Sequence, residues 1–191
     1  HTMEQYLTYP VNAPAQDRFA EGLLQTLIEL APRAMQEGEP DYDNRASLMW
    51  TATLALNGLI GAGVPQDWAT HMIGHELTAL YGIDQARTLA IVLPQVMQAR
   101  REAKREKLLQ YAARVWQITE GSDDERIDAA IARTAQFFES VGIPTRLSAY
   151  QLGGEAVDAV VKALTEHGMV KLGEQRAITP DVSRAILEAA L

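Results

Sequence analysis

Apolar positions recur along most of the chain with the 3.6-residue spacing of amphipathic α-helices. Residues 1–9 are typical of the end of a helix that stops before Pro10. Between residues 15 and 36 the apolar side chains fall on one helical face, and Pro32 predicts a kink or an end late in that run. The polar string 37–44 follows, so the start of the chain is expected to be helix, helix and loop.

The middle of the chain continues this helical pattern. Residues 46–60 are apolar on nearly every side, so this segment is expected to form a central, buried helix. Residues 86–103 also follow a helical period; the run LAIVLP (89–94) within them is short enough for a buried strand, but the lack of turn residues favours helix. The basic string RREAKREK (100–107) places like charges side by side and is expected to be a solvated face.

Capping signals mark the helices of the last third. Ser122 and Glu125 form an S-x-x-E capping box, and Thr179 with Pro180 is typical of an N-cap and first helical position. Helices are expected over 104–119, 122–141, 155–166 and 179–191. With about eight helices, no convincing strand pair and no internal repeat, the pattern predicts an all-α fold. We expect a single multi-helix domain, 1–191, in which residues 121–191 form a looser lobe.

Composition narrows the class of protein. The 191 residues are 47% apolar and 22% charged, as in ordinary globular domains with a substantial core. The net charge of −8 argues against a nucleic-acid or anionic-membrane partner, and no apolar run is long enough for a membrane span. Cysteine is absent, which excludes disulfides, thiolate metal sites and a cysteine nucleophile. We therefore expect a cytoplasmic protein without nucleic-acid or membrane partners.

The main chemical signal is a pair of histidines, His71 and His75. On an α-helix four residues turn the chain by about 400°, so both imidazoles leave the same face. Pro65 suits the first turn of this helix and Gly82 its end. The spacing allows two imidazoles to bind one metal ion, and it equally allows a packed, hydrogen-bonded pair at a helix interface. Because Glu76 follows the second histidine, the zincin pattern H-E-x-x-H is not supported.

Two other motifs resemble functional sites less closely. The segment GLIGAG (58–63) has its glycines in the order G-x-x-G-x-G after a helical segment, which predicts a tight turn and not a dinucleotide loop. His167, which precedes Gly168 at a helix end, is interpreted as a cation near a C-terminal dipole. The candidate chemistry therefore lies with the histidine pair, with His1 as a third partner.

Four segments carry a resemblance to a known family: HTMEQY (1–6), NRASLMWTATLALNGLIGAGVPQDWATHMIGHELTALYGID (44–84), LLQYAARVWQITEGSDDERIDAAI (108–131) and GIPTRLSAY (142–150). They resemble the C-terminal helical domain of iron-containing (group III) alcohol dehydrogenases, in the NADPH-dependent butanol dehydrogenase and aldehyde reductase branch. The resemblance implies the metal-binding half of a two-domain, dehydroquinate-synthase-like fold. The N-terminal nucleotide-binding domain is then absent from this chain, which would start within the first metal-bearing helix.

The resemblance also implies a set of site residues. The family binds its metal through D-x-x-x-H, a histidine of H-x-x-x-H and a histidine about 14 residues later. These ligands correspond to His1, His71 and Gln85, with the aspartate before the chain start and glutamine where the family has histidine. His75 matches the histidine to which the family assigns a catalytic proton-relay or positioning role. Because an amide oxygen is a weaker ligand than imidazole, we expect weak or no metal binding by this fragment, with Asp84 as a substitute carboxylate ligand in the full-length protein.

The implied activity is hydride transfer between NADP(H), bound by the missing domain, and a small aliphatic alcohol or aldehyde. A divalent metal, Fe or Zn, would act as the Lewis acid. Trp68 and Leu77 are candidates for an apolar substrate wall. A homodimer is implied, and the fragment alone is expected to be inactive. The alternative, which Gln85 favours, is a catalytically impaired, dehydrogenase-derived helical module that serves as an interaction or structural domain.

Overall fold

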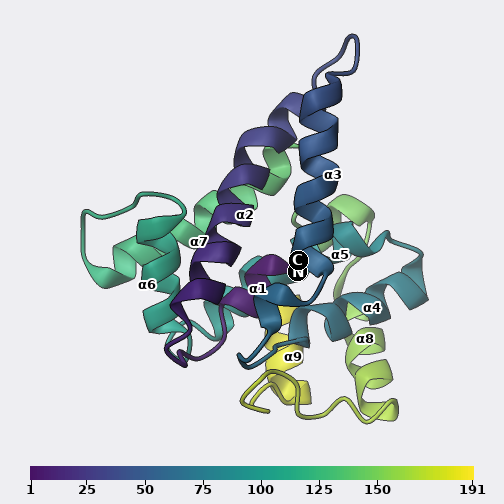
Figure 1. Cartoon of the computed structure of the whole chain (residues 1–191). Helices are drawn as coiled ribbons and strands as arrows, with labels where there is room; N and C mark the ends of the chain where they lie inside the picture. Colours follow the sequence, from purple (N-terminus) through teal and green to yellow (C-terminus); the bar gives the residue numbers. More distant parts are fainter. The chain divides into compact units, whose positions relative to one another are not determined.

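The computed structural model describes all residues, 1–191, and contains nine α-helices, two 3-10 turns and no β-strand (Figure 1). The only strand-like pairing is an isolated antiparallel bridge between Leu172 and Ile178. The all-α prediction is confirmed, with nine helices where the sequence pattern predicted about eight. None of these helices is both long and apolar enough to cross a lipid bilayer.

The chain divides into two compact units, and each is formed by two separate segments of sequence. The first unit comprises His1–Gln66 and Lys104–Arg133. Its elements are α1 (Thr2–Tyr6), α2 (Pro14–Ala34), α3 (Tyr42–Leu56), the 3-10 turn η1 (Leu59–Gly61), α6 (Arg105–Arg114) and the first part of α7 (Asp123–Ser140). In this unit α2 and α3 run side by side as a helical hairpin (Figure 1).

Local chemistry sets the ends of this hairpin. Pro14 stands in the first turn of α2, where its missing N–H costs nothing, and the helix continues past Pro32 for two more residues. The side chain of Asp41 accepts a hydrogen bond from the Asn44 N–H at 3.1 Å and so caps α3. The predicted loop is therefore present but shorter than expected, because helix α3 already begins at Tyr42.

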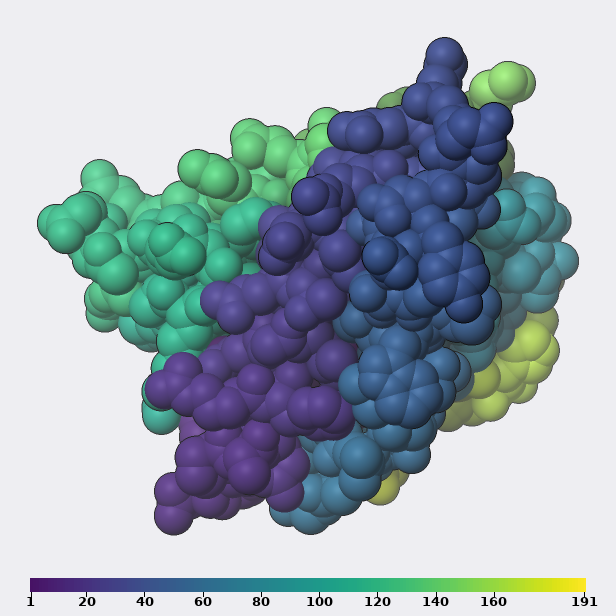
Figure 2. Space-filling view, turned by 45° about the horizontal axis from the view of Figure 1, so that its top comes forward, coloured from purple at the N-terminus to yellow at the C-terminus, as the bar shows by residue number.

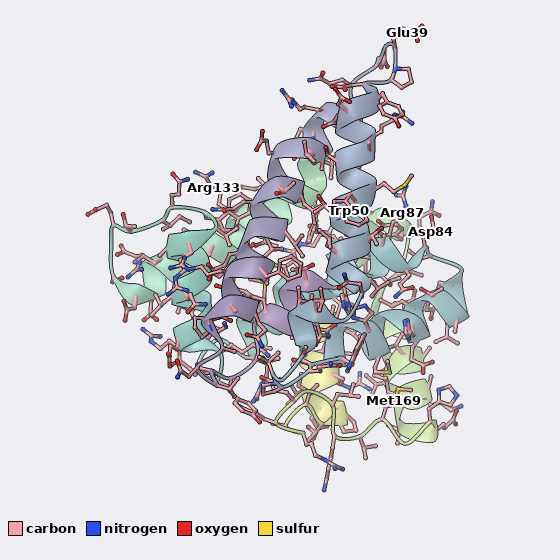
Figure 3. All side chains as sticks on the ribbon, in the orientation of Figure 1. Glu39, Trp50, Asp84, Arg87, Arg133 and Met169 are labelled. Carbon is pink, nitrogen blue, oxygen red and sulfur yellow. The ribbon has the colours of Figure 1, made fainter.

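The prediction that residues 46–60 form a buried helix is wrong. One side of α3 packs against α2 through Asn44, Thr51 and Ala55, which are each at most 9% exposed. The opposite side leaves Met49 and Trp50 73% and 64% exposed. Trp50 is labelled on α3 in Figure 3, and the outer surface of the hairpin is visible in Figure 2. The sequence shows apolar residues on both faces, but it cannot show that only one face has a partner within this chain.

The second unit comprises Asp67–Ala103 and Thr134–Leu191. Its elements are α4 (Ala69–Tyr81), α5 (Gln85–Ala99), the remainder of α7, the 3-10 turn η2 (Leu147–Tyr150), α8 (Gly154–Glu166) and α9 (Pro180–Glu188). One apolar core joins α4, α5, η2, α8 and α9, and it includes Ile73, Ile91, Val160 and Ile186, each at most 1% exposed. Burying one such side chain stabilises a fold by about 1.5–3 kcal/mol, so this core fixes α4 against α5, α8 and α9.

Several local predictions are confirmed. Ser122 and Glu125 form the expected capping box, in which the Ser122 N–H donates to Glu125 Oε2 at 2.8 Å and the Glu125 N–H donates to Ser122 Oγ at 3.3 Å. The LAIVLP run is helical within α5. In GLIGAG, Gly58 has a φ of 93° at the start of a 3-10 turn, as the tight-turn interpretation requires.

The interpretation of RREAKREK as a fully solvated face is wrong for two of its residues. Lys104 and Lys107 are only 5% and 4% exposed. Lysine is rarely this buried unless its ammonium group has partners. Both lysines have such partners within the first unit, and these partners are described below.

Candidate functional site

Helix α4 begins where a buried carboxylate accepts a backbone hydrogen bond. Asp67 is 1% exposed, and its Oδ1 accepts from the Ala69 N–H at 2.8 Å. Pro65 precedes the helix by four residues, so the prediction that it lies in the first turn is wrong. At the other end Gly82 adopts the left-handed conformation (φ 68°) and its N–H donates to the Thr78 carbonyl, as predicted.

The two histidines of α4 lie close together but differ in their access to solvent. The ring centroids of His71 and His75 are 6.0 Å apart and the ring planes are nearly perpendicular, at 85°. His71 is 6% exposed and its ring also lies 5.1 Å from the Trp68 ring, whereas His75 is exposed. A buried imidazole with a fixed orientation suits ligand binding, and an exposed one suits proton exchange with solvent.

Helix α5 approaches α4 closely next to this pair. A Cβ atom placed on Gly74 would lie 2.8 Å from Thr88 Oγ1, so only glycine allows this approach. The Thr88 hydroxyl is fully buried and donates to the Gln85 carbonyl at 2.9 Å, which fixes the first turn of α5. The start of α5 is therefore held rigidly against the helix that carries the histidines.

Gln85 is the first residue of α5 and its side chain is exposed. Asp84 precedes it as the N-cap residue, and Arg87 lies 3.7 Å from the Asp84 carboxylate (Figure 3). A neutral amide thus stands at this helix start, at the position where the resembled family has a histidine. His1 belongs to the first unit, where it is half-buried and its carbonyl accepts from the Gln5 N–H at 3.2 Å.

The donors of this chain fit a tightly held metal ion poorly. No group of three or more histidine, aspartate or glutamate side chains is arranged to hold a metal. The candidate donors are the imidazoles of His1 and His71 and the amide of Gln85, and the substitute carboxylate of Asp84 is exposed and lies beside Arg87. Zn²⁺ and Fe²⁺ sites in proteins are normally completed by imidazole, thiolate or carboxylate groups, so this set is incomplete on chemical grounds.

The structure adds one contact to the site and removes one proposed residue. Glu76, next to His75 on α4, is 5% exposed, and its Oε1 lies 2.7 Å from Nδ1 of His167. The two residues are 91 positions apart, so no local pattern in the sequence points to the pair. Leu77 is fully buried in the core of the second unit and does not form a substrate wall, because it packs against α5 and α8. Trp68 is 40% exposed and stays a candidate.

Comparison with known proteins gives consistent results. All residues, 1–191, match the Fe-containing alcohol dehydrogenase family, C-terminal. The chain is 66% identical over 190 residues to the NADPH-dependent aldehyde reductase YqhD of Escherichia coli (strain K12), and it covers 49% of that protein. It is 35% identical over 193 residues to the probable NADH-dependent butanol dehydrogenase 1 of Bacillus subtilis (strain 168), again with 49% of that protein covered.

Solved structures agree with this match. The substrate- and cofactor-free form of the E. coli YqhD aldehyde reductase superposes with a TM-score of 0.97 at 65% identity, over all of this chain and 50% of that one. The NADH-dependent butanol dehydrogenase A of Thermotoga maritima gives a TM-score of 0.90 at 29% identity. The chain spans about half the length of the relatives it matches. It belongs to the Fe-containing alcohol dehydrogenase family and corresponds to the C-terminal, all-helical part of the proteins in that family.

Proposed function

We propose that this chain is the helical half of a metal-dependent NAD(P)H alcohol dehydrogenase or aldehyde reductase that acts on small aliphatic substrates. The observation that carries the proposal is the match over the whole chain to an NADPH-dependent aldehyde reductase at 66% identity. The pair of one buried and one exposed histidine on α4 supports it chemically. The nicotinamide would be bound by the other half of the protein, and the whole would be a cytoplasmic homodimer.

In this proposal His75 acts on the proton of the reaction. Hydride transfer to an aldehyde carbon leaves an alkoxide oxygen that must gain a proton, and alcohol oxidation requires the reverse. An imidazole can both accept and donate a proton in the neutral pH range, which suits this role. His75 is exposed and can exchange the proton with solvent, and the centroid of the His71 ring lies 6.0 Å from that of His75.

His1, His71 and Gln85 are the proposed metal-facing residues, for Fe²⁺ or Zn²⁺. Because the donor set is incomplete, the 191-residue chain should bind metal weakly or not at all. Calorimetric titration with Zn²⁺ tests this directly, and sub-micromolar binding by the chain as it stands would contradict it. Gln85→His should tighten Zn²⁺ binding at least about ten-fold, since imidazole replaces a neutral amide, whereas Gln85→Asn should not.

The enzymatic proposal is tested by measuring NADPH-dependent reduction of butanal by the full-length protein that contains this chain. His75→Gln should lower kcat by about 10²–10⁴-fold, the usual contribution of a general acid or base. Lys162→Gln, at an exposed lysine of α8, is the control and should keep most of the activity. The 191 residues alone should show no turnover. Butanal reduction by the isolated chain would contradict the need for a nucleotide-binding half.

The second candidate function is a catalytically impaired helical module for interaction or structure, which the amide at Gln85 favours. The two proposals predict different full-length proteins. An enzyme would have a glycine-rich dinucleotide loop upstream and an aspartate four residues before His1, in the D-x-x-x-H pattern. A module would lack both and would show neither turnover nor gain of turnover in Gln85→His.

A further inference from the structure

Two buried lysines of the basic string 100–107 lie against the short helix α1. Lys104 Nζ donates to the carbonyl oxygen of Leu7 at 2.8 Å, across 97 positions of sequence. Leu7 is the C-cap residue of α1, and its own N–H donates to the Met3 carbonyl. A helix end leaves carbonyl groups without partners within the helix and carries partial negative charge. The Lys104 ammonium group therefore gives one of these carbonyl groups a hydrogen-bond donor and places a positive charge next to the partial negative charge.

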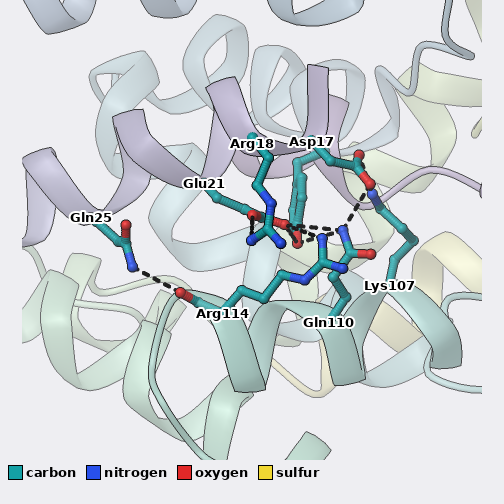
Figure 4. Close-up of polar contacts among 8 residues, drawn as sticks. Asp17, Arg18, Glu21, Gln25, Lys107, Gln110 and Arg114 are labelled. Atoms are coloured by element: carbon teal, nitrogen blue, oxygen red, sulfur yellow. Dashed lines mark hydrogen bonds and ion pairs between the residues drawn. The ribbon is translucent and has the colours of Figure 1, made fainter. Parts of the chain in front are cut away.

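Tyr6, the last residue of α1, is held by a second set of contacts, and its partners Glu21, Lys107 and Gln110 are labelled in Figure 4. Its hydroxyl donates to Glu21 Oε1 at 2.9 Å and accepts from Gln110 Nε2 at 2.9 Å. Lys107 Nζ lies 4.1 Å from the centroid of the Tyr6 ring, in cation–π geometry. Tyr6 is 4% exposed, so its hydroxyl is fixed by α2 on one side and by α6 on the other.

Helix α1 needs these external contacts because it has only five residues. Isolated helices shorter than about 12–15 residues are marginal in water, since nucleation costs more than a few hydrogen bonds return. All five residues of α1 are buried, so its position is set by packing and by the polar contacts at its C-terminal end. His1 is the N-cap residue of the same helix, and its carbonyl accepts from the Gln5 N–H.

We propose that Lys104 and Tyr6 are positioning residues, which fix α1 and thereby the orientation of the His1 imidazole. The inference rests on the proposed function, because that function makes His1 a metal-facing residue. The fixing of α1 is a property of the first unit alone, and it holds whether or not a metal binds. It also gives a reason for the burial of Lys104, which lies at the N-cap of α6 within the basic string.

The test uses amide hydrogen exchange in the 191-residue chain, followed by NMR. In Lys104→Met and Tyr6→Phe the amides of Gln5 and Leu7 should exchange about five-fold faster or more, because loss of one anchoring hydrogen bond lowers the local opening free energy by roughly 1 kcal/mol. Lys104→Arg keeps a cationic donor and should restore slow exchange. The matched controls are Lys162→Met, at a lysine 75% exposed, and Tyr150→Phe, at a tyrosine bonded to the Pro144 carbonyl.

A second readout separates positioning of His1 from general stability. The ring ¹H–¹³C resonances of His1 should be displaced from random-coil positions in the wild type and move toward them in Lys104→Met and Tyr6→Phe. Exchange in α4 should stay unchanged, which excludes global unfolding as the cause. Unchanged exchange of the α1 amides, or loosened amides with an unmoved His1 signal, would overturn the proposal. Failure of the full-length protein to bind metal would count against the proposed function, and these metal-free readouts would still decide this one.

Discussion

The imidazole Nδ1 of His167 lies 2.7 Å from the carboxylate oxygen Oε1 of Glu76 and joins the end of α8 to the middle of α4. The Glu76 side chain is 7% exposed, whereas that of His167 is 59% exposed. Glu76 follows His75 directly, so this contact supports the helix that carries both histidines from the side of α8. A buried carboxylate of this kind is costly without a hydrogen-bond donor.

Removing the donor should therefore destabilise the chain. We expect His167→Ala to lower the free energy of unfolding by about 1 kcal/mol, because Glu76 loses a partner and water replaces it only in part. Urea unfolding followed by circular dichroism measures this change. Lys162→Ala, which removes an exposed 3.8 Å pair with Glu166 on the same helix α8, is the control and should stay within about 0.5 kcal/mol of the wild type. Equal losses in the two variants would contradict the prediction.

The capping box at the start of α7 should make the unfolding of this helix end sensitive to acid. Hydrogen bonds from the Ser122 backbone and hydroxyl hold the pKa of Glu125 below its ordinary value of 4.5. A lowered folded-state pKa means that the stabilisation is present above the ordinary value and is lost as the pH falls through the folded value. Titration of the Glu125 carboxyl ¹³C signal should show this lowered pKa.

Ser122→Ala is the variant that tests the cause of this shift. It removes the hydroxyl donor while the backbone donor of residue 122 stays in place. The pKa of Glu125 should then move part of the way back toward its ordinary value. A Glu125 titration that is identical in Ser122→Ala and in the wild type would show that the hydroxyl contributes nothing.

Signals that are local in the sequence predicted the fold well. Helix ends at Gly82, Ser122 and Thr179 depend on residues within four positions of each other, and each was predicted correctly. Burial depends on distant partners, which the sequence does not show. The exposed side of α3 and the buried Lys104 were both misjudged for this reason, since periodicity indicates that a face is apolar or charged but not what lies against it.

The candidate site was predictable to a similar extent. The spacing of His71 and His75 predicted that both imidazoles share one face of a helix, and their rings do lie 6.0 Å apart. That one is buried and the other exposed follows from the packing of α4, which the spacing cannot reveal. The contact of Glu76 with His167 depends on how α8 packs on α4, so it could be found only in the folded structure.

A buried and an exposed leucine of the first unit should respond differently to replacement by alanine. Leu108 is fully buried in α6, whereas Leu56 at the end of α3 is 68% exposed. Leu108→Ala should lower the free energy of unfolding by about 2–5 kcal/mol through lost burial and a cavity. Leu56→Ala should change it by less than about 0.5 kcal/mol. Chemical denaturation of the 191-residue chain measures both, and similar losses would show that Leu56 is covered in solution, for example by a second copy.

The buried hydroxyl of Tyr6 should make stability fall at alkaline pH. Burial raises the pKa of Tyr6, and the nearby carboxylate of Glu21 raises it further. A folded-state pKa above the unfolded value of about 10 means that the stabilisation is complete below that pH and is lost as the pH rises above it, because the unfolded chain then releases a proton that the folded one keeps. For each pH unit above about 10, the free energy of unfolding of the wild type should therefore fall by about 1.4 kcal/mol more than that of Tyr6→Phe.

Urea unfolding at about pH 9 and about pH 11 measures this difference. Every other titrating group is common to both proteins, so its effect cancels in the comparison. Tyr6→Phe also loses the hydrogen bond to Glu21, so its stability is lower at both pH values, and only the change between them is informative. If wild type and Tyr6→Phe lost equal stability between the two pH values, the Tyr6 hydroxyl would ionise alike in folded and unfolded chains. Burial and the contact with Glu21 would then not hold it as a neutral donor at the end of α1.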